Sequence, residues 1–220
     1  MYRVVLVRHG ESVSNAEGRL QGRADSPLSE AGVHQAHQLG RWLSNCRLDW
    51  GHVYASPLSR ARRTAEILLQ QTGNTSALEL CDELLEIDVG NLEGKALSEL
   101  QAQAPLGASM SELIRSGQFL EFGGEGPQLV LERLSIFKAR VQSQMAMGGR
   151  VLVVAHGGLL RQFFRLLLLN SADVRVPVRT GNCCLTYVRQ TLEGSKRGAE
   201  LRWHLPVELL PMLSDGSSSP

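Results

Sequence analysis

The sequence has no marked excess of charge of either sign. Its 23 lysine and arginine residues are balanced by 22 aspartate and glutamate residues, which gives a formal net charge of +1 at pH 7. Proteins that bind DNA or RNA broadly through the phosphate backbone carry a clear basic excess. We therefore expect no nucleic-acid partner for this chain.

Long apolar segments are also absent. The most apolar region, "GLLRQFFRLLLLN" (158–170), is interrupted by Arg161 and Arg165 and is shorter than the ~20 residues that span a bilayer. The apolar stretch of "MYRVVLVRHGES" is too short for a signal peptide, and no small-residue cleavage site follows it. These absences predict a soluble protein with no membrane partner.

Cysteine is scarce, and its spacing shows no C-x-x-C motif. The four cysteines are Cys46, Cys81, Cys183 and Cys184. The adjacent pair is poorly suited to an ordinary disulfide bond, which needs more widely separated backbones. We therefore expect reduced thiols and a cytoplasmic location.

The chain is nevertheless rich enough in apolar residues to fold. With 220 residues, of which 43% are hydrophobic, it can bury the core of one larger α/β domain. We assign residues 1–213 to this single domain. The last residues, "SDGSSSP" (214–220), are predicted to form a disordered tail.

Segments typical of strands alternate with segments typical of helices. Strands are predicted at 3–7, 52–56 and 150–155, and "CCLTYVRQ" (183–190) with "ELRWHL" (200–205) predicts a closing hairpin. Helices are predicted after a cap at Ser29, over "PLSRARRTAEILLQQTG" (57–73) with Gly73 at its end, from Pro127, and from about Gly158 to Leu169. This order predicts an α/β fold of three layers, α/β/α, with a mostly parallel central sheet.

Basic side chains and glycines follow the two strongest strand segments. "VVLV" (4–7) is followed by Arg8-His9-Gly10, and "VLVVA" (151–155) is followed by His156-Gly157-Gly158. Because ligands of open α/β sheets bind beyond the carboxyl ends of the strands, both histidines are expected at the same edge. A lone histidine after a strand is usually structural, but two in matching contexts favour a site.

Arginines are expected at this edge as well. Arg60 begins the helix that follows "VYAS", whereas Arg62 and Arg63 fit the solvent-exposed face of that helix. Guanidinium groups match phosphate oxygens in bidentate geometry. Two histidines, two arginines and helix N-termini that face one point therefore predict a site for a dianionic phosphate group.

A site that cleaves phosphate esters also needs an acid for the leaving oxygen. "ELLEIDVGNLEG" (83–94) supplies several carboxylates. Glu86 is our candidate, because apolar neighbours such as those in "LLEI" can raise the pKa of a glutamate. Turn capping or solvent exposure explains Glu83, Asp88 and Glu93 better than catalysis does.

These residues occur in motifs that resemble one known family. "RHGES" with Asn15, "LQGRADSPLSEAG", "YASPLSRARRTAE", "LLEIDVGNLEG", "GGEG" and "VVAHGGLLR" follow the order found in the histidine phosphatase superfamily, also called the phosphoglycerate mutase-like superfamily. The likeness runs from about residue 3 to about residue 205, and it implies a phosphoglycerate mutase-like fold with a small cap insertion at about 96–128. Glu125 in "GGEG" departs from the commoner Gly-Glu-Ser pattern, which leaves its role open.

The resemblance implies roles for individual residues. It makes His9 the nucleophile that becomes phosphohistidine, it assigns the phosphoryl oxygens to Arg8, Arg60 and His156, and it makes Glu86 the proton donor. It also implies lesser contacts from Asn15 and the Gly157 backbone. The rest of the substrate is expected to touch the cap and the loop "GRLQGRADS" with Gln21, Gly22 and Arg23, and Arg175 and Arg179 are further candidates.

The implied chemistry needs no metal ion or other cofactor. Attack by the His9 imidazole would form the phosphohistidine, and water would then cleave it. The histidines and carboxylates of the chain show no H-E-x-x-H or similar metal-ligand spacing.

Three functions remain open. Mutases of the family typically carry long insertions, whereas here only residues 87–155 separate Glu86 from His156, and the second motif reads "AHGGLLR" rather than the mutase-like "HGNSLR". These features favour a metal-independent phosphoric monoester hydrolase, similar to the histidine acid phosphatases, over a cofactor-dependent phosphoglycerate mutase. The intact catalytic set disfavours a catalytically inactive binding module.

The sequence does not specify the substrate. Phosphoglycerate derivatives, glycosyl-phosphoglycerates, phosphoserine, nucleoside-type phosphates and sugar phosphates all remain open. "TGNCCLTYV" and "LRWHL" look similar to phosphatases that act on phosphoglycerate-type compounds, which favours a small acidic phosphorylated metabolite as the partner. A homodimer is compatible with the sequence, which does not specify the oligomeric state.

Overall fold

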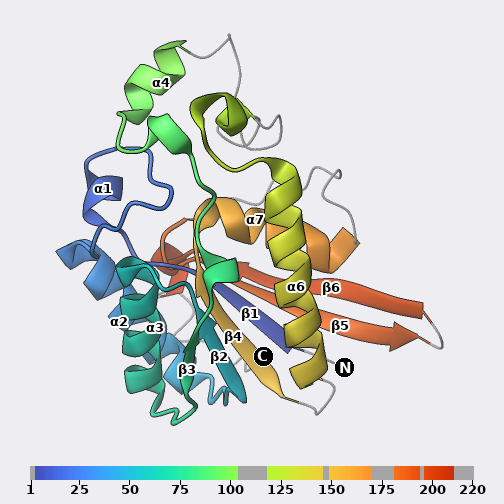
Figure 1. Ribbon diagram of the computed structural model, residues 1–220. Coiled ribbons are helices and arrows are strands. Elements are labelled where there is room, and N and C mark those ends of the chain that lie inside the picture. The colour runs from blue at the N-terminus through green and yellow to red at the C-terminus, as the bar shows by residue number, and fades with distance from the viewer. Residues whose placement is uncertain (1–2, 104–117, 146–148, 170–180, 194–195, 211–220) are drawn as a thin grey trace.

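A computed structural model describes residues 3–103, 118–145, 149–169, 181–193 and 196–210 (Figure 1). Within these ranges the sheet has six strands in the order β3-β2-β4-β1-β5-β6. The strands are Arg3–Arg8 (β1), His52–Ala55 (β2), Leu78–Leu80 (β3), Arg150–Ala155 (β4), Leu185–Glu193 (β5) and Lys196–Leu205 (β6).

The first four strands are parallel to one another. β4 pairs with both β1 and β2, and β3 pairs with β2 at the edge of the sheet. β5 runs antiparallel to β1, and β6 runs antiparallel to β5. The predicted mostly parallel sheet is confirmed, and β3 is an addition that the sequence did not reveal.

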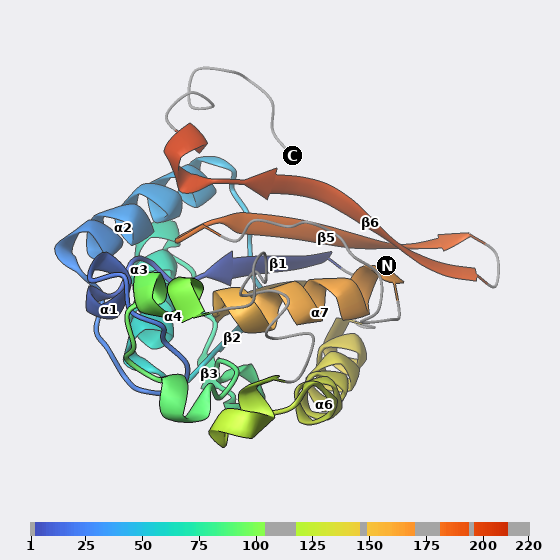
Figure 2. The same ribbon diagram turned by 90° about the horizontal axis from the view of Figure 1, so that it is seen from above.

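Helices cover both faces of this sheet (Figure 2). α2 (Glu30–Asn45) and α3 (Ser59–Thr72) pack on one face, where they meet Val5 and Val7 of β1. α6 (Pro127–Met145) and α7 (Gly157–Leu169) pack on the other face, where they meet Val4 and Leu6. β1 is thus buried on both sides, and the predicted three-layer α/β/α architecture is confirmed.

The helix ends follow the sequence signals. Ser29 is the N-cap of α2, and its side chain accepts a hydrogen bond from the Gly32 amide at 3.0 Å. Gly73 ends α3 in the left-handed conformation, with φ of 64°. Pro127 is the first residue of α6, where its missing N–H leaves no helical bond unmade.

The predicted cap insertion at 96–128 is described in part. α4 (Leu97–Gln103) and the short helix η3 (Gln118–Phe122) belong to it, and Leu97 packs against the hydrophobic core that includes residues of α6 and α7. Residues 104–117, Arg175, Arg179 and the predicted tail at 214–220 lie outside the described residues. No helix in the described ranges is both long and apolar enough to cross a membrane.

Candidate active site

The carboxyl ends of β1, β2 and β4 meet at one edge of the sheet. Arg8 at the end of β1 pairs with Ala155 at the end of β4, and the His9 amide donates a hydrogen bond to the Ala155 carbonyl at 2.9 Å. The amide of Ser56, the first residue after β2, pairs with β4 in the same way. His9, Ser56 and His156 therefore emerge together, as predicted for the two histidines.

The His9 ring is buried and held in one tautomer. Its Nδ1 lies 2.6 Å from the Gly10 carbonyl oxygen, which can only accept, so Nδ1 carries the proton and Nε2 keeps its lone pair. Burial lowers the pKa of His9 well below its usual value, and the charges of Arg8 and Arg60 lower it further. At neutral pH His9 thus offers an uncharged Nε2, the form that can attack phosphorus.

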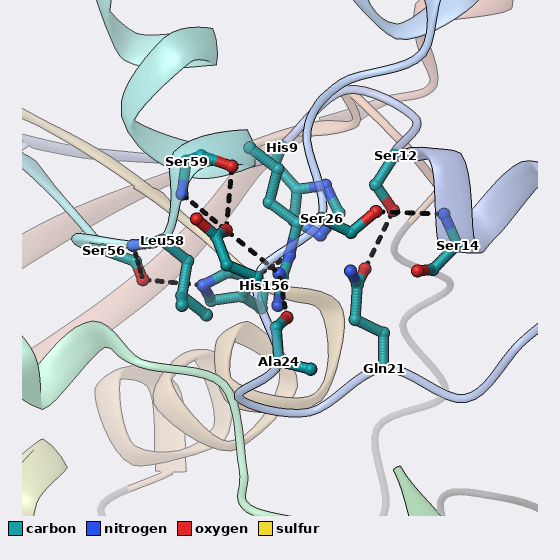
Figure 3. Close-up of polar contacts among 12 residues, drawn as sticks. His9, Ser12, Ser14, Gln21, Ala24, Ser26, Ser56, Leu58, Ser59 and His156 are labelled. Atoms are coloured by element: carbon teal, nitrogen blue, oxygen red, sulfur yellow. Dashed lines mark hydrogen bonds and ion pairs between the residues drawn. The ribbon is translucent and has the colours of Figure 1, made fainter. Parts of the chain in front are cut away.

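His156 lies against His9 (Figure 3), with 5.1 Å between the ring centroids. The Arg60 Nε–H donates to Nδ1 of His156 at 3.2 Å, so Nε2 of His156 carries the proton and donates to Ser56 Oγ at 2.7 Å. Burial, and after it the neighbouring His9 and Arg60, lower the pKa of His156 well below its usual value. His156 is therefore a neutral ring that is hydrogen-bonded at both nitrogens.

Arg60 is buried in the first turn of α3, with only 1% of its surface exposed. Its Nη1 donates to the Ala24 carbonyl at 2.9 Å, and its Nη2 donates to the Gly22 carbonyl at 2.7 Å. Burial lowers the pKa of Arg60 to about 10, against the opposing effect of the Glu86 charge, so the group stays charged at neutral pH. One guanidinium thereby links α3, His156 and the loop that contains Gly22.

Two carboxylates, those of Glu93 and Asp25, also fix the loop that contains Gly22. Glu93 accepts hydrogen bonds from the amides of Gly22 (2.8 Å) and Ala24 (3.1 Å), so it has the capping role that the sequence predicted. Asp25 accepts from the amide and the hydroxyl of Ser59 at the start of α3, where the helix's own N-cap residue makes no side-chain bond. The loop at 22–25 is thus fixed against the helix that carries the buried arginine.

Arg8 occupies the last position of β1, directly before His9. Its amide donates to the Cys184 carbonyl at 3.2 Å, which fixes its backbone to the neighbouring strand region. Burial lowers the pKa of Arg8, and the charge of Glu86 opposes this change. Arg8 and Arg60 together place two positive charges next to the His9 ring.

Asn15 and Gln21, both predicted substrate contacts, are anchored through their side-chain oxygens. Asn15 Oδ1 accepts from the Ser12 amide at 3.4 Å and from Asn182 Nδ2 at 3.1 Å. Gln21 Oε1 accepts from the Ser12 hydroxyl at 2.8 Å (Figure 3), and its Nε2 is buried without a hydrogen-bond partner among the described residues. The two amide NH₂ groups are thus the ends that remain to donate to an anion.

Sequence reasoning missed Asn182. Its Nδ2 also lies 3.3 Å from the His9 carbonyl oxygen, so it ties the nucleophile's backbone to Asn15. The available signal was its place in "TGNCC", shortly before β5, which pairs with β1.

Glu86 is buried at the N-terminus of α7. Its Oε1 accepts from the amides of Ile87 and Leu159, and its Oε2 accepts from the Gly158 amide, each at 2.9 Å. The apolar surroundings expected from "LLEI" are therefore not what the carboxyl group meets, because three backbone N–H groups surround it. Oε1 has both lone pairs engaged, whereas Oε2 retains one that can carry a transferable proton.

Arg23 is exposed, but its guanidinium contacts the protein's own carboxylates. Its Nη2 lies 3.3 Å from Glu125 Oε2, and its Nη1 lies 3.9 Å from Asp88 Oδ2. Its Nε donates to the Glu86 carbonyl at 3.4 Å. The residue predicted as a substrate contact is thus engaged within the protein.

The residues that the sequence assigned to structural roles have such contacts. Asp88 Oδ1 accepts from the Gly90 amide at 2.8 Å and so closes a turn. Arg62 and Arg63 lie on the exposed face of α3 and form ion pairs with Glu66.

The cysteine and acidic side chains of the described residues do not form a metal site. In the parts of the chain that the structure describes, no three or more histidine, cysteine, aspartate or glutamate side chains gather as a metal-binding group. All four cysteines are free thiols, and burial raises the pKa of Cys183 to about 12 and that of Cys184 to about 11. Both thiols beside Arg8 are therefore protonated at neutral pH.

The sequence model of the histidine phosphatase superfamily (branch 1) matches residues 4–200. The chain belongs to the histidine phosphatase superfamily. The membership and the fold implied by the motif resemblance are confirmed.

Named members of the superfamily include a mutase and phosphatases. "Probable phosphoglycerate mutase GpmB" of Salmonella paratyphi A is 32% identical over 189 residues, which cover 86% of this chain and 85% of that protein. The structure of alpha-ribazole phosphatase from Shigella flexneri matches with a TM-score of 0.75 and 26% identity, over 93% of this chain and 96% of that one. A mycobacterial glucosyl-3-phosphoglycerate phosphatase matches with a TM-score of 0.74 and 27% identity, over 92% of this chain and 99% of that one.

In this member of the superfamily, most of the predicted site residues lie at the strand ends and at the start of α7. Gly157 is buried as the first residue of that helix. Contacts or charge interactions link the residues predicted to act on the phosphoryl group, which are Arg8, His9, Arg60, Glu86 and His156. Arg23 differs from them in being directed to Asp88 and Glu125.

Proposed function

We propose that the chain is a phosphatase that hydrolyses a small phosphorylated metabolite, a phosphate monoester, through a phosphohistidine on His9. The observation that carries this proposal is the state of the His9 ring. It is buried and neutral, and its Nδ1 is bound to the Gly10 carbonyl, which leaves Nε2 to attack. Arg8 and Arg60 place positive charge beside it for the phosphoryl oxygens.

In the first step, His9 Nε2 donates its lone pair to phosphorus, and the bond between phosphorus and the ester oxygen breaks. The leaving oxygen takes a proton from Glu86 Oε2, which holds that proton in the complex with the phosphate dianion, and departs as a neutral alcohol. The phosphoryl group is then on Nε2. The Nδ1 proton stays on its bond to the Gly10 carbonyl, which stabilises the positive charge of the phosphorylated ring.

In the second step, water attacks phosphorus and gives a proton to the Glu86 carboxylate. The bond between phosphorus and nitrogen breaks, its electron pair returns to Nε2, and inorganic phosphate leaves. Arg8 and Arg60 stabilise the charge of the phosphoryl group in both steps. The His156 ring lies against His9, and its Nε2–H can contact the same group once it leaves its bond to Ser56 Oγ.

A cofactor-dependent phosphoglycerate mutase is the second candidate, because a relative with 32% identity is named as one. Two observations support the phosphatase. Phosphatases are among the structures similar to this chain. The interval between Glu86 and His156 is short, which favours a small cap and access of water to the phosphohistidine.

The proposal includes a reaction without a metal ion or other cofactor. The two arginines supply the positive charge that metal ions supply in other phosphoryl-transfer sites. The four free thiols support a cytoplasmic location.

Release of inorganic phosphate over a substrate panel, measured in EDTA, tests the phosphatase. The panel holds 3-phosphoglycerate, glucosyl-3-phosphoglycerate, α-ribazole 5′-phosphate, phosphoserine, a sugar phosphate and a nucleoside monophosphate. We expect release from at least one compound at a rate that EDTA does not change. No release from any compound contradicts the phosphatase, and activity that EDTA abolishes and Mg²⁺ or Zn²⁺ restores contradicts metal independence.

Incubation with 3-phosphoglycerate and 2,3-bisphosphoglycerate separates the two candidate functions. If water reaches the phosphohistidine before bound product is phosphorylated again, inorganic phosphate accumulates and little 2-phosphoglycerate forms. Rapid interconversion of the two monophosphoglycerates without phosphate release would instead identify a mutase.

A further inference from the structure

The segment that carries Glu86 has no regular secondary structure of its own. It connects the short helix η1 (Asp82–Leu84) to the short helix η2 (Gly90–Leu92). Since buried backbone carbonyls need hydrogen-bond donors, the donors for this segment have to come from another part of the chain.

Arg133 of α6 supplies these donors. Its Nη1 donates to the carbonyls of Glu83 and Leu85, each at 2.7 Å. Its Nη2 lies 3.5 Å from the carbonyl oxygen of Glu86 itself. One guanidinium therefore holds the backbone on both sides of the Glu86 side chain.

Glu125 fixes the orientation of this guanidinium. Its two carboxylate oxygens accept from Nε and Nη2 of Arg133, each at 2.8 Å, in bidentate geometry. The two side chains are only 7% and 13% exposed. Because the bidentate pair fixes the plane of the guanidinium, the remaining nitrogen of Arg133 is directed at the carbonyls around Glu86.

The backbone next to Glu125 packs on the same segment. The Glu125 amide donates to the Asp88 carbonyl at 2.8 Å. A Cβ on Gly124 would lie 2.5 Å from the Asp88 carbonyl oxygen, and one on Gly90 would collide with the Phe122 carbonyl. Gly124 of "GGEG" and Gly90 of the opposite loop thus allow the two loops to touch backbone to backbone.

We propose that Glu125 and Arg133 are positioning residues for the proton transfer by Glu86, an inference that rests on the proposed function. They act through the Glu86 backbone. By holding that backbone, they set where the Glu86 carboxyl group meets the N-terminus of α7, and hence where the Oε2 proton lies relative to the leaving oxygen.

Two substrates separate proton transfer from phosphate binding. An alkyl phosphate, the best one in the panel, needs a proton on its leaving oxygen, whereas the phenolate of p-nitrophenyl phosphate leaves readily without one. Glu86→Gln sets the reference, with an expected loss of about 10²-fold or more on the alkyl phosphate and a much smaller loss on the aryl phosphate. Glu125→Gln and Arg133→Lys should show the same selectivity, with a loss of about tenfold on the alkyl phosphate, since small misplacements of a reacting group are costly.

A double variant and a matched control complete the test. Glu86→Gln combined with Glu125→Gln should lose no more activity on the alkyl phosphate than Glu86→Gln alone, because no acid remains to be positioned. Arg140→Gln is the control. Arg140 lies on α6 and pairs with the side chains of Glu79 and Glu83, so its loss should leave the ratio of the two rates unchanged.

The outcomes distinguish this inference from the proposed function. If Glu86→Gln is selective but Glu125→Gln and Arg133→Lys slow both substrates alike, or if the losses multiply in the double variant, the positioning role is wrong. If Glu86→Gln itself slows both substrates alike, the acid assignment fails and the inference fails with it.

A buried charge left unpaired can prevent folding. If a single variant does not fold, Glu125→Gln combined with Arg133→Met removes both charges and is judged by the same ratio of rates.

Discussion

At the scale of single residues, the protonation of the two histidines depends on a neighbour that can only accept a hydrogen bond and a neighbour that can only donate one. The Gly10 carbonyl fixes the proton of His9 on Nδ1, because a carbonyl has none to give. The Arg60 guanidinium can only donate, so it fixes the His156 proton on Nε2. The protonation pattern of both rings therefore follows from two contacts.

Arg60→Lys should lower kcat/KM for the best substrate by about 10²-fold or more, in the range seen when one charge-stabilising donor is lost. A single ammonium group cannot reproduce the fork that bonds the carbonyls of Gly22 and Ala24 and Nδ1 of His156. Steady-state kinetics measure the effect, with Arg63→Lys on the exposed face of the same helix as the control. Equal values for the two variants would remove Arg60 from the site.

The sequence predicted the positions of single residues well where they directly follow a strand or begin the helix after it. His9, His156 and Arg60 are of this kind, because their places depend on local strand and helix signals. Asn182 and Arg133 could not be found in this way. Their partners Asn15 and Glu83 lie far away in the chain, and apart from the place of Asn182 in "TGNCC", shortly before β5, nothing near either residue in the sequence indicates these contacts.

At the scale of elements, the N-terminus of α7 is the support for the candidate acid. The amides of Gly158 and Leu159 both donate to Glu86, as the unpaired N–H groups of a first helical turn commonly do with an acidic side chain. A Cβ at position 158 would lie 2.7 Å from Glu86 Oε1. A side chain at this position would therefore push the carboxyl group out of its present place on the helix.

Gly158→Ala is predicted to slow hydrolysis of an alkyl phosphate by about tenfold or more, because the methyl group displaces the Glu86 carboxyl. The loss with p-nitrophenyl phosphate should be smaller. Gly51→Ala is the matched control, since a Cβ there meets its nearest heavy atoms at an ordinary 3.7 Å. An unchanged rate in Gly158→Ala would show that the acid does not need its place on the helix.

Helices and strands with a strong apolar pattern were predictable from the sequence, whereas those with a weak pattern were not. β4 has the expected bounds, and α2 begins directly after the expected cap at Ser29. β3 escaped because it has three residues and two of them are exposed, which leaves no apolar pattern to detect.

At the scale of the whole molecule, the two buried histidines make stability depend on pH. Each would bind a proton near pH 6.5 in the unfolded chain, whereas burial lowers the pKa of His9 and His156 well below that value in the folded protein. Below about pH 6.5 the unfolded state thus binds more protons, and the free energy of unfolding falls as the pH falls. The slope is up to about 1.4 kcal/mol per pH unit for each histidine.

Urea denaturation at pH 7.5 and pH 5.5 measures this dependence. The wild type should lose stability at the lower pH, and His9→Gln should lose less because one of the two groups is gone. A wild type that is equally stable at both values, or a variant with an undiminished loss, would contradict the neutral state of His9 in the folded protein.

The most direct measurement is to trap the phosphorylated enzyme with a ³²P-labelled substrate, quench it in base and map the labelled peptide. The account predicts a label that is stable in base and labile in acid, on the peptide that contains His9, and no label on a His9→Ala variant with an unchanged circular dichroism spectrum. A label that survives acid, or one that persists in His9→Ala, would place the nucleophile on another residue and contradict the account.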